Sequence, residues 1–421
     1  MDLIETDARL FHRFLDRESR ETAELLSRHG VLDITELRTG LKVQANSHVG
    51  KIQLNGLQFT VYPKIQGFPL YRLLKYAYGI RELRLYDRAI YDLDESPFQD
   101  LLIHHLCAEA EELIARGLDK RYRKEEAELE LVRGRISINR VAAKSEFSRP
   151  TLPCRYFART EDSVLNRVLL SGLILAVNIA DDHMLKARLR RLIQTLEATI
   201  SPVELSKDLL IRVSRSLDRL NEHYRPALEL INILLSSYGL FAGKGRSHKR
   251  LYSFFFDMNV FFQALLSRLL NDYLEGYAVR NEYVLYDMFA YEPGHNPLGN
   301  TPPRPRPDFA VIRKRKVVCL LDAKYRDLWE HGLPSSWLYQ LAIYAASGVG
   351  EGAAKILYPT TSERAKLQVL KVRNPATGKA FCRVLLQPVS LIKVAQLLDL
   401  AEQGKRSLKK YIEETVFEGI R

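Results

Sequence analysis

Residues 307–324 read PDFAVIRKRKVVCLLDAK, and this stretch decides the fold expected for the C-terminal part of the chain. Its basic centre predicts the turn of a β-hairpin. An antiparallel hairpin folded at Arg315 places Asp308 and Asp322 directly opposite each other on one face. Lys324 lies two residues further along, so it shares this face while the strand continues. Because opposed carboxylates repel each other, the pattern suggests a divalent cation between them, and two acidic oxygen donors suit Mg²⁺.

The apolar run VVCLL at 317–321 is typical of a strand that is buried on both faces. A buried strand that ends at Asp322 and Lys324 must provide partners for these charges. The motif alone is short, and in isolation it fits a surface hairpin with solvated charges equally well. Around it the sequence predicts a helix at 258–274, a strand at 283–286, a helix at 335–346, a strand at 354–358 and a strand pair at 367–372 and 382–386. This order predicts a mixed sheet flanked by helices.

The composition indicates a protein with several domains and a polyanionic partner. The chain has 421 residues, of which 46% are hydrophobic, and its formal net charge of +12 favours nucleic acid as the partner. The N-terminus has no apolar signal-peptide segment, and no apolar run approaches the ~20 residues of a membrane span. The four cysteines form no CxxC pair, which argues against a zinc ribbon. We therefore expect a cytoplasmic protein with no membrane contact.

The chain is expected to be an α+β, α/β multidomain protein with three parts. Residues 1–98 form a β-rich domain, with strands predicted at 40–45, 51–54 and 57–62 and a hairpin turn at Asn55-Gly56. Residues 99–244 are mainly helical, with helices predicted at 99–116, 162–180, 184–196 and 209–240. Residues 245–421 contain the Asp308/Asp322 hairpin.

Basic segments in the first two thirds of the chain are candidates for phosphate contacts. Arg133 and Arg135 flank a glycine, and arginine forks match phosphate oxygens. A solvated charged face is the other explanation, and the sequence alone favours it. Lys244 and Arg246 belong to a Gly-rich basic stretch at 242–250 that is typical of a linker or loop. This stretch is not a Walker A loop, because Gly follows Lys244, so we expect the chain to bind no nucleotide.

The sequence resembles the McrC family, the nuclease subunits of McrBC 5-methylcytosine-specific restriction systems. The PD at 307–308 and the DAK at 322–324 resemble the PD-(D/E)xK nuclease motif. Further matches are FDMN at 256–259, Tyr325, Tyr339-Gln340 and Tyr344, with weaker ones at 49–50, 62–65, 133–135 and 166–167. The resemblance thus covers most of the chain, and its C-terminal motifs are the more specific.

The resemblance implies a Mg²⁺-dependent endonuclease domain of the restriction-endonuclease-like type. Asp308, Asp322 and Lys324 are the catalytic residues that it implies. The two carboxylates and the carbonyl oxygen of Ala323 would hold Mg²⁺, which polarises the scissile phosphate and lowers the pKa of a bound water. Lys324 would orient that water or stabilise the charge of the transition state.

The resemblance also implies partners. McrC-like proteins act with McrB, a hexameric AAA+ GTPase that recognises methylated cytosine in double-stranded DNA and translocates it. Residues before about 245 would dock on the McrB ring and stimulate GTP hydrolysis, and the remainder would cut DNA. Lys64, together with the four basic residues named above, is a candidate contact with the partner or with DNA.

Gln263 is the point where the sequence departs from the family, in which we expect a glutamate. Glutamine carries no charge, so either this position is dispensable or another acid replaces it, with Glu282 or Asp257 as candidates. Asp257 is also well placed to cap the following helix. Gln340 and Tyr344 share a helix face that would support the active site, although Tyr344 fits a core position equally well. A non-catalytic DNA-binding adaptor and a stand-alone repair nuclease are the alternative functions.

Overall fold

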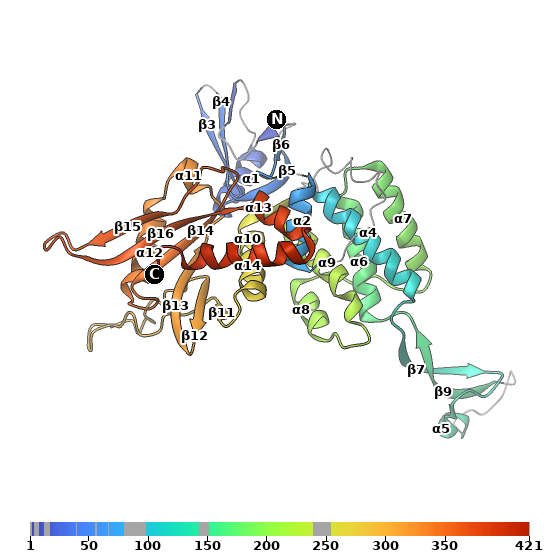
Figure 1. The fold of residues 1–421 in the computed structure, drawn as a ribbon. Helices are drawn as coiled ribbons and strands as arrows, with labels where there is room; N and C mark the ends of the chain where they lie inside the picture. Colours follow the sequence, from blue (N-terminus) through green and yellow to red (C-terminus); the bar gives the residue numbers. More distant parts are fainter. Residues whose placement is uncertain are drawn as a thin grey trace. The chain divides into compact units, whose positions relative to one another are not determined.

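The computed structural model describes residues 2–3, 8–11, 17–38, 40–54, 57–65, 67–79, 98–142, 151–238 and 254–420. The chain divides into two compact units (Figure 1). The first unit combines Met1–Ser96 with Leu240–Arg421, and the second unit is Pro97–Gly239. The separation of the first unit into domains at 1–98 and 245–421 stays a prediction. Within the described residues, no helix is both long and apolar enough to cross a membrane.

A six-stranded mixed sheet forms the C-terminal part of the first unit. Its strand order is β11-β12-β13-β14-β16-β15. The strands are β11 (Ala278–Asn281), β12 (Phe309–Arg313), β13 (Lys316–Ala323), β14 (Ala353–Thr360), β15 (Gln368–Arg373) and β16 (Ala380–Ser390). The three central strands β13, β14 and β16 are parallel, and the outer pairs are antiparallel. The carboxyl ends of the parallel strands therefore meet at one edge of the sheet.

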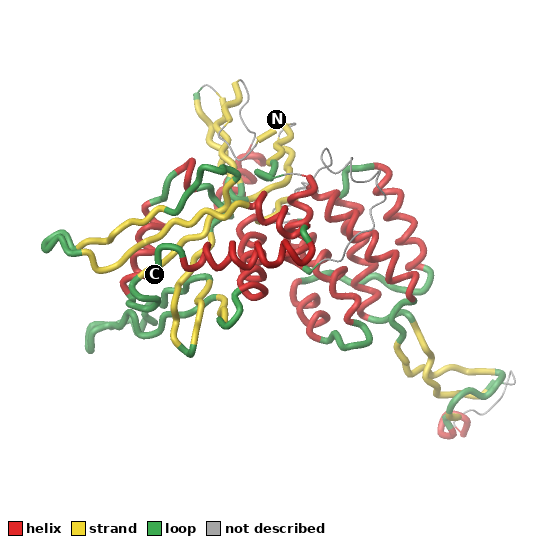
Figure 2. Tube along the Cα trace, in the orientation of Figure 1, coloured by secondary structure: helices red, strands yellow, loops and turns green. Residues whose placement is uncertain are grey.

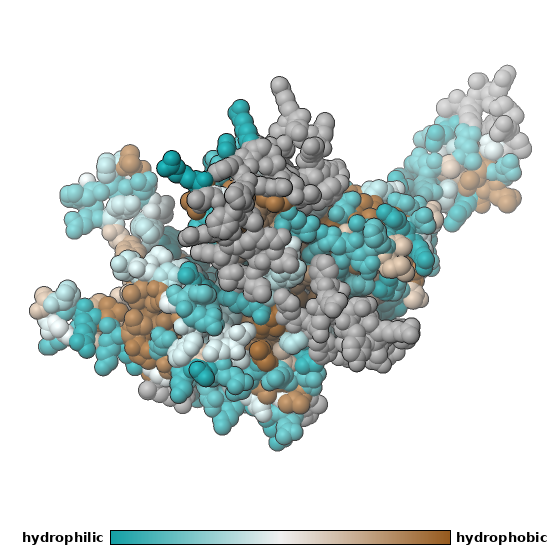
Figure 3. All heavy atoms as spheres, turned by 90° about the horizontal axis from the view of Figure 1, so that it is seen from above, coloured by the Kyte–Doolittle hydropathy of each residue, from teal (hydrophilic) through white to brown (hydrophobic). Residues whose placement is uncertain are grey.

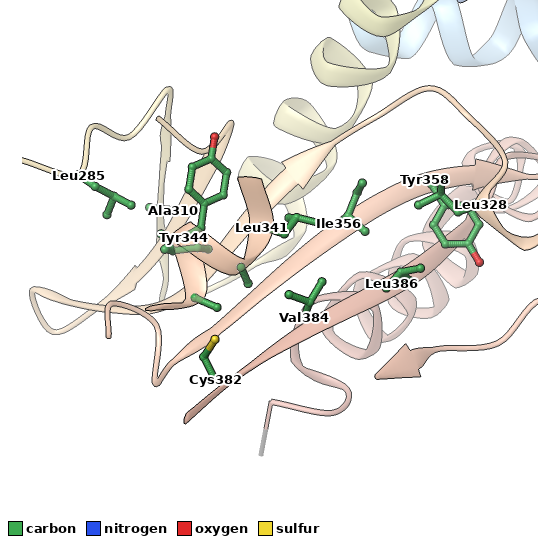
Figure 4. Packing of buried hydrophobic residues seen from close by; sticks show 13 residues of the cluster. Leu285, Ala310, Leu328, Leu341, Tyr344, Ile356, Tyr358, Cys382, Val384 and Leu386 are labelled. Atoms are coloured by element: carbon green, nitrogen blue, oxygen red, sulfur yellow. The ribbon is translucent and has the colours of Figure 1, made fainter. Parts of the chain in front are cut away.

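Helices cover both faces of this sheet, which is why every residue of β14 is buried. On one face, α12 (Ser335–Ala346) packs over Ile356, and Tyr358 lies beside Leu328 in the same core, which is shown in Figure 4. Lys355 alternates with these residues and contacts the end of α14 (Ala401–Phe417) on the other face. The remaining helices of this part are α10 (Met258–Tyr273), α11 (Leu328–His331) and α13 (Leu391–Asp399).

The N-terminal part of the first unit contains two small sheets, ordered β1-β6-β5-β10 and β2-β4-β3. Their strands are β1 (Asp2–Leu3), β2 (Ala8–Phe11), β3 (Leu32–Leu37), β4 (Gly40–Ala45), β5 (His48–Leu54), β6 (Leu57–Val61) and β10 (Phe254–Asp257). The helices are α1 (Arg17–Arg28) and α2 (Gly67–Tyr78). β10 leads directly into α10, so one strand joins the N-terminal sheet to the helix that packs on the larger sheet.

Gly50 permits the close approach of β5 and β10. Its φ is +146°, and a Cβ atom there would lie 1.8 Å from the carbonyl oxygen of Phe254. We expect Gly50→Ala to lower the free energy of unfolding by about 3 kcal/mol, because the paired strands must separate. Gly30→Ala is the matched control, because Gly30 has a positive φ but no atom within 4 Å of the added Cβ. Thermal unfolding of the two variants measures the difference, and equal losses would contradict the role of the contact.

The second unit is a helical bundle with a projecting β-arm (Figures 1 and 2). Its helices are α4 (Phe98–Arg116), α6 (Val164–Ile179), α7 (His183–Glu197), α8 (Lys207–Arg215), the 3₁₀ turn η1 (Glu222–Tyr224) and α9 (Arg225–Ser237). The arm connects α4 to α6 and consists of β7 (Arg121–Leu129), β8 (Arg135–Ile136), α5 (Ile138–Ala142) and β9 (Leu152–Thr160). β7 and β9 pair over their full length, and hydrophobic side chains are exposed among the polar ones (Figure 3).

Asn166 fixes the base of this arm. It is fully buried, and its Nδ2 donates to the carbonyl oxygens of Asp119 (2.9 Å) and Glu161 (2.6 Å), which flank the two ends of the arm. The hydroxyl of Tyr224 donates to Oδ1 of Asn166 (2.6 Å) and accepts from the backbone N–H of Asp119 (2.9 Å). Each polar group of this buried network has a partner, so the network fixes the two ends of the arm relative to the helices of the bundle.

Most of the helices and strands predicted from the sequence agree with the structure, with three exceptions. The predicted helix at 209–240 is wrong as a single helix, because α8 ends at Arg215 and α9 begins only at Arg225. The predicted strand at 283–286 is wrong: the strand is β11, which ends before Glu282, where φ is +50°. The arm was not predicted, because β7 is mostly charged and lacks an apolar alternation. The turn predicted at Asn55-Gly56 lies outside the described residues, although Leu54 and Leu57 on either side of it are paired.

Candidate active site

The hairpin of β12 and β13 places Asp308 opposite Asp322, as the sequence predicted. Lys314 and Arg315 form a two-residue turn, both with positive φ. Such a turn alone would bring Asp308 opposite a leucine, one residue short of Asp322. A register shift on the strand pair adds the missing residue, so that Phe309 pairs with Leu321. The β-bulge therefore determines that the two carboxylates face each other.

Asp322 is buried at the end of β13 with only 2% of its surface exposed. Nζ of Lys324 lies 2.8 Å from its Oδ2. This ammonium is the charge partner of the buried oxygen. Burial raises the pKa of Asp322 to about 6; the ammonium of Lys324 opposes this rise and the carboxylate of Asp308 adds to it. Additional positive charge near Asp308 and Asp322 would therefore stabilise their ionised carboxylates.

Asp308 is held by the backbone of the opposite strand. Its Oδ2 accepts the N–H of Ala323 at 2.7 Å. The N–H and C=O of one strand residue point to the same side, so the carbonyl group of Ala323 also faces the side of Asp308. Two carboxylates and one carbonyl oxygen thus converge at the end of the hairpin.

Tyr344 positions the segment that precedes Asp308. Its hydroxyl donates to the carbonyl oxygen of Arg306 (3.1 Å) and accepts from Nε2 of Gln340 (2.6 Å). Burial raises the pKa of Tyr344 to about 12, and the nearby carboxylates of Asp322 and Asp308 contribute to this. The structure thus brings Gln340 and Tyr344 to the site, and Tyr344 is both a core residue and a support for it.

Asn259 links the segment after β13 to the N-terminal part of the unit. Its Oδ1 accepts the N–H of Tyr325 at 3.1 Å, and its Nδ2 donates to Oγ of Ser47. Asp257 caps α10, accepting the N–H of Asn259 at 2.8 Å, which confirms the cap predicted from the sequence. The role of Asn259 was missed, although the FDMN motif that contains it was noted.

A cavity of about 750 Å³ opens beside Lys324. Gln263 and Lys64 line it, so both sequence candidates lie near Lys324. Nζ of Lys64 lies 5.3 Å from the centre of the Tyr325 ring. The other lining residues are Gly30, Gln44, Ala45, Asn46, Ser47, Asn259, Ala323, Arg326, His331 and Trp337.

Of the other four basic candidates, two lie in the second unit and two lie outside the described residues. Arg133 and Arg135 lie on the arm of the second unit, where the Arg133 guanidinium stacks at 4.7 Å from the Tyr156 ring centre. Lys244 and Arg246 lie outside the described residues. Glu282, one of the acids considered as a replacement at position 263, is exposed and ion-paired with Arg306 at 3.5 Å.

The residues at the end of the hairpin fit a hydrated divalent cation. The buried Oδ2 of Asp322, which faces the ammonium of Lys324, and the carboxylate of Asp308 offer anionic oxygen ligands. In the part of the chain that the structure describes, no cluster of three or more His, Cys, Asp or Glu side chains could hold a metal. Mg²⁺ needs no such cluster, because it keeps several waters and is bound through one or two carboxylates.

A family model matches most of the chain. The model described as "McrBC 5-methylcytosine restriction system component" matches residues 43–359. The chain belongs to this family. The match covers β5, β6 and β10 of the N-terminal part, the second unit and the strand β13 with its carboxylate, so it confirms the McrC-like resemblance drawn from the sequence.

Solved structures match the chain, and the first of the two described next shows the same fold. One is the refined half-complex from a tetradecameric assembly of Thermococcus gammatolerans McrB AAA+ hexamers with bound McrC, with a TM-score of 0.63 at 19% identity over 96% of this chain and 90% of that chain. A cryo-EM structure of the Thermococcus gammatolerans McrBC complex matches with a TM-score of 0.46 at 20% identity, over 65% of this chain and 88% of that chain. No curated protein matches the chain.

Proposed function

We propose that this chain is the McrC-like endonuclease subunit of a modification-dependent restriction complex and cuts DNA with Mg²⁺. The facing pair Asp308 and Asp322, with the ammonium of Lys324 2.8 Å from Asp322, is the observation that carries the proposal. The mixed sheet with its parallel centre and flanking helices agrees with the PD-(D/E)xK nuclease fold. Membership of the McrBC family supports the same assignment.

Each residue at the site has a separate role in phosphodiester hydrolysis. Asp308, Asp322 and the carbonyl oxygen of Ala323 would hold Mg²⁺, which when bound polarises the phosphate and acidifies a water. Lys324 orients the attacking water and stabilises the negative charge that develops on the phosphate. Tyr344 acts through the backbone of Arg306 and keeps Asp308 in place.

The partner in this proposal is an McrB-like AAA+ GTPase hexamer. Support comes from the family match and from a solved structure described as McrB AAA+ hexamers with bound McrC. Residues before about 245 would dock on the ring and stimulate its GTP hydrolysis. The arm suits such a contact because it exposes large hydrophobic side chains, namely Tyr122, Leu131, Val132, Ile138 and Phe157. The substrate would be double-stranded DNA that contains modified cytosine.

A non-catalytic DNA-binding adaptor is the second candidate. One observation favours it: Gln263 occupies the position where a glutamate is expected, and among the described residues no third acid joins Asp308 and Asp322. Such an adaptor would bind DNA in the complex without cutting it, so metal-dependent cleavage separates the two functions.

Cleavage is expected only with Mg²⁺. The full chain is mixed with its GTPase partner, GTP and plasmid DNA that carries methylated cytosine, and nicking or linearisation is followed on a gel. Addition of EDTA should abolish cleavage, because the two carboxylates then have no cation to bind. Mg²⁺ in excess over EDTA should restore it. An absence of cleavage in the complete mixture, with complex formation and GTP hydrolysis intact, would favour the adaptor.

A further inference from the structure

The cavity beside Lys324 is cationic. Lys64, Lys324, Arg326 and His331 line it, and none of its described lining residues is an aspartate or a glutamate. The chain as a whole carries 51 acidic residues against 63 Lys and Arg, so a cavity of this size without a carboxylate is a local departure from the mixed surface. Amide and hydroxyl groups from Gln44, Asn46, Ser47, Asn259 and Gln263 provide the remaining polar lining.

The N-terminal part of the unit supplies one wall of this cavity. The segment from Gln44 to Ser47 comprises the end of β4 and the turn before β5, and Lys64 follows β6. The opposite wall comes from the segment after β13, including Arg326. Asn259 bonds to both walls through Ser47 and Tyr325, so their spacing is fixed within one unit.

We propose that this cavity binds the phosphate backbone of the DNA strand next to the scissile phosphate, with Lys64 as a phosphate contact from the N-terminal part. The inference rests on the proposed function and assigns its substrate subsite. Lys64 is held over the ring of Tyr325, the residue that directly follows Lys324, so its charge lies close to the reacting position. Lysine, arginine and histidine in a groove without carboxylates are suited to successive phosphodiesters.

This assignment gives the N-terminal part of the chain a second role. The first 65 residues would not serve ring docking alone, because they would also hold the substrate at the nuclease site. The phosphates of GTP offer the same chemistry as those of DNA, so the test must separate these two sources.

The test measures DNA binding rather than cleavage. A short fluorescent duplex is titrated with the full chain in EDTA, by anisotropy, over a series of salt concentrations. We expect Lys64→Gln to weaken binding about tenfold at low salt and to reduce the slope of log K against log salt by about 1, as for the loss of one phosphate contact. Lys64→Arg should restore both values. Lys371→Gln is the matched control, because Lys371 is exposed on the edge strand β15, three strands from β13.

Three outcomes would overturn the proposal. The first is equal affinity and slope for Lys64→Gln and Lys371→Gln, with both variants folded by thermal unfolding. The second is a loss of GTPase stimulation in Lys64→Gln with unchanged DNA binding, which would assign Lys64 to the partner. The third is displacement of the duplex by GTP that depends on Lys64, which would assign the cavity to a nucleotide. No readout requires cleavage, so a failure of the nuclease proposal is distinguishable from a failure of this one.

Discussion

Asp308→Asn is expected to reduce the rate of Mg²⁺-dependent cleavage by about 10³-fold or more. The substitution removes one of two anionic ligands but retains an oxygen that can accept the N–H of Ala323, so the hairpin keeps its geometry. The remaining carboxylate, Asp322, is buried and paired with Lys324, and one such ligand holds the cation too weakly for hydrolysis. Single-turnover cleavage of methylated DNA, with the partner and GTP present, measures the loss.

Asp287→Asn is the control for this variant. Asp287 is exposed in the loop before the hairpin and has a φ of +58°, a conformation that asparagine adopts readily, so cleavage should be unchanged. Complex formation and GTPase stimulation should be normal in both variants. A folded Asp308→Asn protein that cuts DNA at the rate of Asp287→Asn would exclude the metal-assisted mechanism. A folded variant that no longer binds the partner would contradict the separation of cutting from docking.

The hairpin shows what could be predicted from sequence and what could not. Two acids at equal distances from Arg315, followed by a lysine, predicted a site because the period of a strand fixes which side chains share a face. The register, however, depends on a bulge between a two-residue turn and Asp308. Nothing in the apolar run indicates the bulge, because every residue of that run is compatible with either register.

Lys64 and Asn259 show a different limit. The segments at 62–65 and 256–259 both resemble the family, but they lie far from residues 322–324 in the sequence and no periodicity links them. Their common place at the cavity follows from β10, which pairs with β5 and continues into α10. Contacts of this kind depend on tertiary pairing, whereas the helices and strands themselves follow from local patterns.

Lys355 is a further residue that no sequence pattern singled out. It lies in the central strand β14 and is fully buried. Its Nζ donates to the carbonyl oxygens of Thr415 (2.9 Å), Val416 (2.8 Å) and Glu418 (2.8 Å) at the end of α14. The last carbonyl groups of a helix have no partner within the helix and carry the negative end of its dipole, so an ammonium group with three donors satisfies them. Burial lowers the pKa of Lys355 to about 8.

Lys355→Met is expected to lower the free energy of unfolding by about 3–5 kcal/mol, because it leaves three buried carbonyl groups without a donor. Methionine fills a similar volume, so the loss reports the missing hydrogen bonds rather than a cavity. Chemical denaturation of the full chain measures it. Lys410→Met is the matched control. Lys410 lies on α14 itself with 79% of its side chain exposed, so its substitution should change the free energy of unfolding little. If Lys355→Met unfolds at the same denaturant concentration as Lys410→Met, the buried ammonium does not hold α14 on the sheet.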